Sequence, residues 1–417
     1  MAQATNRAIE AVWRIESARL IAGLAHVVGD VGRAEDLAQD ALVAALEQWP
    51  RDGIPGNPGA WLMATAKHQA IDSIRRSATL RRKQDVLERD ARIELESEMA
   101  DLDDNADDHI GDDMLRLVFI CCHPMLSTEA RVALTLRLLG GLTTDESGRA
   151  FVTPVPTIQQ RIVRAKRTLS EARVPFEVPP QAQLVDRLES VLEVVYLIFN
   201  EGYSATAGDD WMRPELCNEA LRLGRVLEGL MPDQPEVHGL AALMELQASR
   251  LRARRGPDGA PVLLADQNRS SWDGLLITRG LAALGRAESL ARPLGAYTLQ
   301  AAIAACHARA RHIEDTDWAR IVALYDALAV LNPSPVVELN RAVAISMAYG
   351  PAQALELVDA LVADGRLESY HLLPAVRADL LDRLGRHAEA RQDLIRAAAL
   401  TRNEQERSLL LKRAAGN

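Results

Sequence analysis

The sequence of 417 residues contains little cysteine, no long apolar run and no strand-like alternation of polar and apolar residues. Four cysteines are too few for a disulfide framework, which favours a reducing cytoplasm. No apolar stretch reaches the ~18 residues that a membrane span needs. The first residues, MAQATNRAIEAVW, lack the charged and then apolar order of a signal peptide. We therefore expect a cytoplasmic chain with no membrane partner.

No arrangement of residues that is typical of catalysis stands out, so we expect a protein that is not an enzyme and needs no cofactor. The run Cys121-Cys122-His123 is the best candidate for a metal site, but a second pair of ligands at a fitting spacing is missing. We expect these cysteines to be small core residues and no metal to be bound.

Charge is strongly segregated along the chain. The net charge of −10 would repel nucleic acid if it were evenly spread. However, residues 61–89 hold seven Lys or Arg against three acids, whereas residues 86–113 hold twelve acids against two arginines. Basic and acidic blocks in this order fit DNA-facing modules joined by a solvated linker.

Residues 127–170 are typical of helices joined by a tight turn. Ser127 is expected to cap a first helix, and Gly140-Gly141 to end it. A short helix is predicted over about 144–151, Pro154 and Pro156 break the chain, and Thr157 is expected to cap a last helix that runs to about 173. Ile158, Ile162 and Leu169 should be its core positions. That helix carries five cations against one acid: Arg161, Arg164, Lys166, Arg167 and Arg173 against Glu171. This layout is that of a helix-turn-helix, whose second helix lies in a DNA major groove.

The periodicity along the chain predicts an all-α protein of several domains. Its divisions are a helical domain at 1–85, an acidic linker at 86–113, a helix-turn-helix domain at 114–173, a proline-rich joint at 174–183 and a helical tail at 184–417. In the tail, residues 347–361 resemble 382–398, with their glycines 35 residues apart. Two helices per ~34 residues is the tetratricopeptide pattern, so these units should stack into a solenoid.

The helix predicted over 33–49 has an apolar stripe of Leu37, Ala41, Leu42, Ala45, Leu46 and Trp49, and a polar face opposite it. A Pro/Gly-rich loop at 50–59 follows, and then a helix from about 58 to 76 that continues into basic sequence to Lys83. This stretch resembles region 2 of bacterial sigma factors, and residues 127–170 resemble their region 4. Together with the tail, the chain resembles the extracytoplasmic-function (group IV) RNA polymerase sigma factors of the subgroup with a long C-terminal tetratricopeptide-like extension.

The resemblance implies a factor that binds core RNA polymerase, through the β′ coiled coil and the β flap, and promoter DNA. The polymerase contact would use Asp36, Gln39 and Asp40. The −10 element would be read and opened by Trp61, Lys67, His68, Gln69, Asp72, Arg75 and Arg76, although Trp61 also suits a core position. The −35 element would be bound by Thr157, Gln159, Gln160, Arg161, Arg164, Lys166 and Arg167. Among these, glutamine favours adenine and arginine favours guanine.

Two places depart from the usual pattern of the family. His68-Gln69 stands where the family often has Asn-Arg, which would change the preferred −10 bases. Ser147 and Gly148 stand where an aliphatic residue and alanine are usual, and glycine in a helix costs about 1 kcal/mol against alanine. We therefore expect a less stiff first helix of the helix-turn-helix.

Eight polar or aromatic residues of the tail form a candidate regulatory set, which could bind a small ligand or the sigma domains: Asn200, Glu201, Tyr203, Asp266, Gln267, Arg269, Trp272 and Asp273. Turn and capping chemistry explains such residues equally well. We expect the tail to regulate the factor. The rival functions are a stand-alone helix-turn-helix regulator with a ligand- or protein-binding tail, and a helical-repeat enzyme or scaffold with a DNA-binding domain attached.

Overall fold

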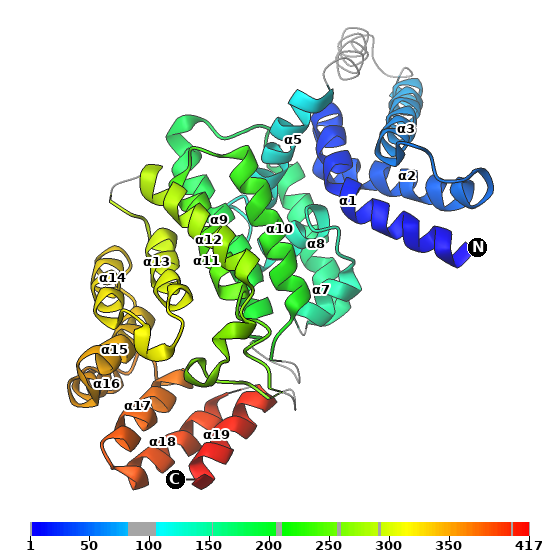
Figure 1. The fold of residues 1–417 in the computed structure, drawn as a ribbon. Helices are drawn as coiled ribbons and strands as arrows, with labels where there is room; N and C mark the ends of the chain where they lie inside the picture. The colour runs from blue at the N-terminus through cyan, green and yellow to red at the C-terminus, as the bar shows by residue number, and fades with distance from the viewer. Residues whose placement is uncertain are drawn as a thin grey trace. The chain divides into compact units, whose positions relative to one another are not determined.

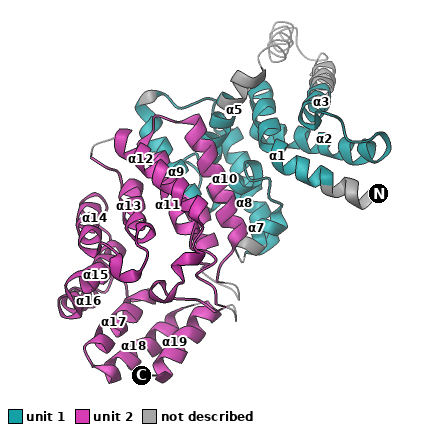
Figure 2. Ribbon diagram, viewed as in Figure 1, with its two compact units in different colours: residues 1–195 teal, residues 196–417 magenta. Residues whose placement is uncertain are grey.

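Helices make up all the regular structure of the described residues, which confirms the predicted all-α fold (Figure 1). The computed structural model describes residues 2–81, 106–151, 153–205, 211–256, 260–290, 293–401 and 403–416. Within these ranges, the one strand-like pairing is an isolated bridge between Arg255 and Pro261. The chain divides into two compact units, residues 1–195 and residues 196–417 (Figure 2).

The first unit contains two small helical domains. Its described helices are α1 (Ala2–Val28), α2 (Val31–Asp52), α3 (Pro58–Arg81), α5 (Ala106–Cys121), α6 (Thr128–Leu138), α7 (Thr144–Ala150), α8 (Val155–Glu171) and the first part of α9 (Gln181–Tyr203). The boundary between the two units falls inside α9. The proline-rich stretch 174–183 therefore lies within the first unit.

The first small domain is built from α1, α2 and α3, with α5 packed on α1. Asp30 caps α2 by accepting a hydrogen bond from the Arg33 amide at 2.8 Å. The buried Asp113 carboxylate on α5 lies 2.6 Å from both His26 Nδ1 on α1 and Arg116 Nη1. Because α5 begins at Ala106, the last eight residues of the acidic stretch 86–113 are helical, whereas residues 82–105 lie outside the described ranges.

The helix-turn-helix has the expected three helices, with one error at the start of the last. Ser127 caps α6 through the Ala130 amide at 3.3 Å, as predicted. The predicted cap at Thr157 is wrong, because α8 begins earlier, at Val155, with Pro154 at its N-cap and no side-chain cap. Pro156 fits in the first turn since the amide that proline lacks has no helical partner there. Proline thus starts this helix instead of separating it from the turn.

Glycine has a steric role at two points of the helix-turn-helix. Gly141 has φ +64°, and a Cβ there would lie 3.1 Å from Ser17 Oγ on α1. A Cβ at Gly148, on α7, would lie 2.9 Å from the Thr153 carbonyl oxygen and 3.2 Å from Val155 Cγ2. The absent side chain at Gly148 therefore lets α7 approach the start of α8 closely. A capping box also fixes the start of α7, because Thr143 Oγ1 accepts from the Glu146 amide at 3.1 Å while Glu146 accepts from the Thr143 amide at 2.8 Å.

Helix α9 is anchored to the helix-turn-helix domain through its first half. The buried Arg131 side chain on α6 donates hydrogen bonds to Ser190 and, at 3.0 Å, to Glu193. Ser190 also donates to the Cys122 carbonyl at 2.6 Å, and Arg187 donates to the Phe119 carbonyl at 2.8 Å. The first unit therefore needs residues up to about 195 to satisfy its own polar groups.

The second unit is a series of helices packed mainly against their neighbours in sequence. Its helices after α9 are α10 (Pro214–Leu230), α11 (Pro235–Ala248), α12 (Gly274–Leu290), α13 (Ala296–Arg309), α14 (Trp318–Leu331), α15 (Pro335–Tyr349), α16 (Pro351–Asp364), α17 (Leu372–Arg383), α18 (His387–Leu400) and α19 (Glu404–Gly416), with short 3-10 turns η1 (Leu264–Asp266), η2 (Arg269–Ser271) and η3 (Ile313–Asp315). Gly350 joins α15 to α16, and Gly385 lies between α17 and α18, so each of the two similar sequence segments contains a turn between helices and most of the second helix. None of the described helices is both long and apolar enough to cross a bilayer.

Candidate functional site

Helix α8 presents a polar face and a buried face. Ile158, Ile162 and Leu169 are buried, as predicted, together with Ala165. Gln159, Gln160, Arg164 and Arg167 are exposed, whereas Thr157, Arg161 and Lys166 are half-buried. The exposed residues follow one side of the helix, which is the arrangement that groove reading needs.

Lys166 lies at the edge of this face and forms an ion pair with Glu35 of α2. Glu35 is buried, with its side chain 4% exposed, and also accepts from Arg137 Nε on α6 at 2.7 Å. Gln39 Nε2 donates to the same carboxylate at 2.7 Å. One buried carboxylate therefore links α2 of the first small domain to both α6 and α8 of the helix-turn-helix.

A second contact joins the same two domains. Arg14 on α1 forms an ion pair with Glu146 on α7 at 2.6 Å. The turn at Gly141 approaches α1 beside Ser17. The two small domains of the first unit thus form a direct interface, here called the α2–α8 interface, whose ion pairs are Glu35–Lys166, Glu35–Arg137 and Arg14–Glu146.

The side of α2 that is predicted to face polymerase is partly exposed to solvent. Asp36 and Asp40 are exposed, whereas Gln39 is half-buried by its bond to Glu35. Val43 is 53% exposed and Leu46 is 42% exposed. The prediction that Leu46 belongs to the buried apolar stripe of α2 is therefore wrong, because Leu46 is exposed to solvent. The exposed surface of α2 combines carboxylates with apolar side chains, as protein-binding surfaces often do.

The predicted −10 residues lie on α3, and only some of their side chains are described. Trp61 is half-buried and packs edge-on against the buried Trp49, with ring centroids 5.3 Å apart. His68 is exposed, Lys67 is half-buried, and the half-buried Gln69 has an Oε1 with no hydrogen-bond partner among the described residues. Asp72, Arg75 and Arg76 belong to α3, but their side chains lie outside the described set.

The eight tail residues separate into local structural roles and one cluster. Glu201 is buried in an ion pair with Arg213. Asp273 accepts hydrogen bonds from the amides of Leu275 and Leu276 at 2.9 and 3.1 Å, which is capping chemistry. Asn200 and Asp266 are exposed. The remaining four residues, Tyr203, Gln267, Arg269 and Trp272, lie around one group of arginines and aromatic rings.

This group, here called the cation–aromatic cluster, consists of Tyr203, Trp211, Arg250, Arg254, Gln267, Arg269, Trp272 and His307. The Arg254 guanidinium carbon lies 3.6 Å from the centroid of the Tyr203 ring and 4.8 Å from that of Trp211. Arg250 and Arg269 lie 5.7 and 5.1 Å from the Trp272 ring. Sequence reasoning missed Arg250 and Arg254, although the basic run RLRARR at 250–255 marks their position.

The four cysteines are buried and free. Burial raises the pKa of Cys122 to about 11 and that of Cys217 to about 12. Cys121 and Cys122 are therefore inert core residues, as expected from the sequence. The described residues hold no group of three metal-ligating side chains.

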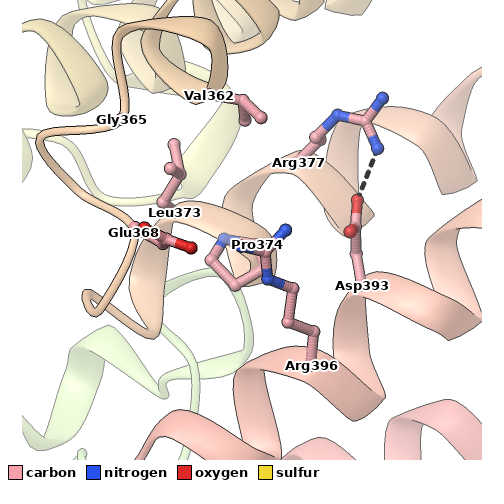
Figure 3. Close-up of a pocket in the computed structure, with 8 residues that line it drawn as sticks. All are labelled: Val362, Gly365, Glu368, Leu373, Pro374, Arg377, Asp393 and Arg396. Atoms are coloured by element: carbon pink, nitrogen blue, oxygen red, sulfur yellow. Dashed lines mark hydrogen bonds and ion pairs between the residues drawn. The ribbon is translucent and has the colours of Figure 1, made fainter.

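A cavity of about 290 Å³ lies among α16, α17 and α18 (Figure 3). Its charged lining is Glu368, Arg377, Asp393 and Arg396. Arg377 donates to Asp393 at 2.7 Å, as the dashed line in Figure 3 shows, and to Asp359 at 2.7 Å. Because two carboxylates compensate Arg377, this cavity is less suited to an anion than the cation–aromatic cluster.

Comparison with known proteins agrees with the architecture of the first unit. The family model for sigma-70 region 2 matches residues 15–79, and a family of unknown function, DUF6596, matches residues 187–288. The chain is 30% identical over 168 residues to a probable RNA polymerase sigma-C factor of Mycobacterium bovis, which covers 40% of this chain and 84% of that protein. It is 29% identical over 199 residues to a probable ECF RNA polymerase sigma factor, SigI, of Mycobacterium tuberculosis, which covers 45% of this chain and 67% of that protein.

The similarity to another relative also covers most of the C-terminal tail. The chain is 45% identical over 376 residues to an uncharacterized protein of Rhizobium meliloti, which covers 89% of this chain and 87% of that protein. No solved structure matches the chain. The region 2 match and the sigma-factor relatives place the chain in the class of transcription initiation factors called sigma factors. Within that class, the chain belongs to the extracytoplasmic-function RNA polymerase sigma factors.

Proposed function

We propose that the chain directs core RNA polymerase to promoters by binding DNA at two points, and that it acts as a binding factor without catalysis of its own. The observation that carries this proposal is the exposed Gln159, Gln160, Arg164 and Arg167 face of α8, in a chain whose residues 15–79 match sigma-70 region 2. A stand-alone helix-turn-helix regulator would leave the region 2 match without a role. An enzyme or scaffold built on the helical tail would leave both small domains without one.

The −35 element would be bound by α8. Gln159, Gln160 and Arg164 are exposed and would reach base edges, while Arg167 would hold a phosphate. Thr157 and Arg161, which are half-buried, would contact the DNA backbone at the edge of the groove. Lys166 is paired with Glu35, so it would have to release that carboxylate in order to bind a DNA phosphate. DNA binding at this edge therefore competes with the α2–α8 interface.

The −10 element would be bound by the α3 side of the first domain. His68 is exposed and suited to touch a base, and Lys67, Arg75 and Arg76 supply positive charge on the same helix. Gln69 and Asp72 complete the set. Trp61 is held by Trp49, so we assign it to shaping the end of the loop at 50–59 and not to stacking on a base.

Core polymerase would dock on the exposed side of α2, with its β′ coiled coil, and on the helix-turn-helix domain, with its β flap. Asp36 and Asp40 are free for this contact, and Val43 adds apolar surface. Run-off transcription with purified core polymerase on a promoter library tests the function directly. We expect transcripts that depend on the chain, and their loss with the double variant Asp36→Ala, Asp40→Ala. The matched control is Asp186→Ala, an exposed acid on α9. Equal loss in the control, or no chain-dependent transcript at all, would contradict the proposal.

The tail would regulate this activity, through contact with the sigma domains or through a ligand. The support is that α9 begins on the helix-turn-helix domain and belongs to both compact units. A chain that ends after Tyr203 keeps the bonds of Arg131 to Ser190 and Glu193, so its sigma domains retain their polar contacts. We expect promoter output from this shortened chain to differ from that of the full chain. Identical output with purified polymerase would rule out regulation by the tail.

A further inference from the structure

Three arginines of the cation–aromatic cluster bond only to neutral acceptors. Arg250 donates to the Tyr203 hydroxyl at 2.6 Å. Arg254 donates to the Tyr203 carbonyl oxygen. Arg269 donates to the carbonyl oxygens of His307 and Ala310 at 2.6 and 3.0 Å. None of these three guanidinium groups forms an ion pair with a carboxylate of the described residues.

Other arginines of the second unit form ion pairs with carboxylates. Arg225 pairs with Glu245 at 3.0 Å, Arg341 with Asp326 at 2.6 Å, and Arg377 with two aspartates. Among the described acids, Glu406 raises the pKa of Arg254, and Glu314 and Asp315 raise the pKa of Arg269, in each case without forming an ion pair. Three positive charges are thus gathered in one place where folding alone would favour pairing.

The charges of the cluster are partly withdrawn from water. Burial lowers the pKa of Arg254 and of Arg269, and the charge of Arg250 lowers both further. The aromatic faces of Tyr203, Trp211 and Trp272 offset part of this cost, because a guanidinium stacks favourably on such rings. The rings hold the arginines side by side and add no negative charge.

Polar atoms without partners lie among the same side chains. Among the described residues, Nε1 of Trp272, which is 7% exposed, has no acceptor, and Oε1 of Gln267, which is 8% exposed, has no donor. Nδ1 of His307 is also unpartnered. Burial, and then the charges of Arg250 and Arg269, lowers the pKa of His307 to about 4, so the ring is neutral near pH 7. Buried polar atoms without partners are rare in folded proteins, and a bound molecule is one of the explanations for them.

A cavity lies next to Ala310, whose carbonyl oxygen accepts a hydrogen bond from Arg269, although none of the eight cluster residues lines it. This cavity of about 380 Å³ is lined by Cys306, Ala310 and three further arginines, Arg309, Arg311 and Arg320, with Asp315 and Asp317. Ala310 contributes to both places, since its carbonyl oxygen accepts from Arg269. The volume is within the range that small-ligand sites occupy.

We propose that the cation–aromatic cluster is a binding site for a small oxyanion that carries two or more negative charges, on phosphoryl or carboxylate groups. Guanidinium groups match both kinds of oxyanion with paired, charge-assisted hydrogen bonds. The ligand would supply the negative charge that the described residues do not provide to Arg250, Arg254 and Arg269, and any part of it beyond the cluster would extend toward the cavity beside Ala310. The tail of this sigma factor would then be a receptor for an anionic small molecule.

Isothermal titration calorimetry on the full chain tests the site, with pyrophosphate and citrate as probes at constant ionic strength set by chloride. We expect saturable binding of one equivalent of at least one probe, and a concentration-dependent rise in the thermal midpoint. Arg250→Gln and Arg269→Gln should each weaken binding about tenfold or more, because each removes one charged donor. The matched control Arg341→Gln, far from the cluster in sequence and already ion-paired, should bind as the parent chain does.

Binding of pyrophosphate alone would assign a phosphoryl ligand, and binding of citrate alone a carboxylate ligand. The proposal is overturned if neither probe shows saturable binding, or if the control loses as much affinity as the cluster variants. Circular dichroism of each variant checks that helix content is kept, and Arg250→Lys, which keeps the charge, should retain part of the affinity. No polymerase is present in these titrations, so their failure would leave the sigma-factor proposal untouched, and failed transcription would leave the binding site untouched.

Discussion

Lys166 on α8 and Glu35 on α2 form an ion pair between the helix proposed to read the −35 element and the helix proposed to face polymerase. Glu35 also holds Arg137 at 2.7 Å. The Glu35 carboxylate therefore couples Lys166, which is proposed to bind DNA, to α2, which is proposed to bind polymerase. If α8 moves away from α2, the Glu35 carboxylate needs new partners, because a buried charge without partners is costly.

The first prediction concerns Glu35→Gln. The amide removes the negative charge between Lys166 and Arg137 and keeps the shape of the side chain. We expect the free energy of unfolding of the chain to fall by about 1.5–3 kcal/mol, as measured by urea unfolding, because hydrogen bonds to a charged group are lost. Affinity for promoter DNA should rise at low salt, because Lys166 is released. Glu47→Gln, at an exposed position of α2, is the control, and equal effects of both variants would argue against a special role of the interface.

The second prediction separates base reading from phosphate binding on α8. Arg164→Ala should weaken binding by ~1–3 kcal/mol at particular −35 sequences and by less at others. Arg167→Ala should weaken all sequences alike and lower the salt dependence of binding, and its exposed pair with Glu171 at 2.6 Å contributes little to stability. Lys166 is a poor choice for this comparison because its removal also breaks the pair with Glu35. Fluorescence anisotropy with a set of −35 duplexes measures both effects, and the same sequence profile for both variants would contradict the assignment.

The third prediction concerns Gly148→Ala. Alanine is the better helix former, yet here we expect it to destabilise the chain by about 1–3 kcal/mol, because its Cβ would lie 2.9 Å from the Thr153 carbonyl oxygen. Gly229→Ala on α10 is the matched control, since nothing lies within 4 Å of a Cβ there. That variant should be neutral or more stable by up to about 1 kcal/mol. Thermal unfolding of both variants gives the comparison, and a stabilised Gly148→Ala chain would mean that α7 can move away from α8 at no cost.

The fourth prediction concerns pH and His307. Its pKa is lowered from 6.5 to about 4 by burial and by the charges of Arg250 and Arg269. Between these two values the unfolded chain binds a proton that the folded chain does not, so stability falls as the pH falls through this window. The slope from this one group reaches about 1.4 kcal/mol per pH unit. Denaturant unfolding at several pH values should show a flatter profile for His307→Gln than for the parent. An unchanged slope in His307→Gln would exclude His307 as the source.

Helix positions on the helix-turn-helix could be predicted closely because their signals are local. Ser127 supplies a side-chain cap, Gly141 supplies a left-handed turn, and the apolar positions Ile158, Ile162 and Leu169 repeat at helical spacing. The start of α8 does not follow from the proline signal alone, because proline breaks a helix interior but is well tolerated in the first turn of a helix. The cost expected for Gly148 was judged from helix propensity alone, whereas the structure shows that the missing side chain makes room for a neighbouring backbone.

Contacts between distant segments were beyond the sequence. Glu35 stands next to the acids predicted to face polymerase, and nothing local indicates that its partners lie 102 and 131 residues further on, at Arg137 and Lys166. In the tail, the motif residues Tyr203 and Trp272 drew attention, but Arg250 and Arg254 reach them only through the packing of the loop after α11. The sequence therefore identifies half of the cation–aromatic cluster, and the fold brings in the other half.

The burial of all four cysteines makes the rest of the chain available for optical probes. Maleimide dyes react with exposed thiolates, and burial raises the pKa of the native thiols. Cys306 also lines the cavity beside Ala310, so in a chain with Cys306→Ala a dye would attach only where a cysteine is introduced. Val43 on α2 and Val163 on α8 are 53% and 63% exposed and belong to the two small domains of the first unit. A donor and acceptor dye at these two positions would report in real time whether the domains separate as a promoter complex forms.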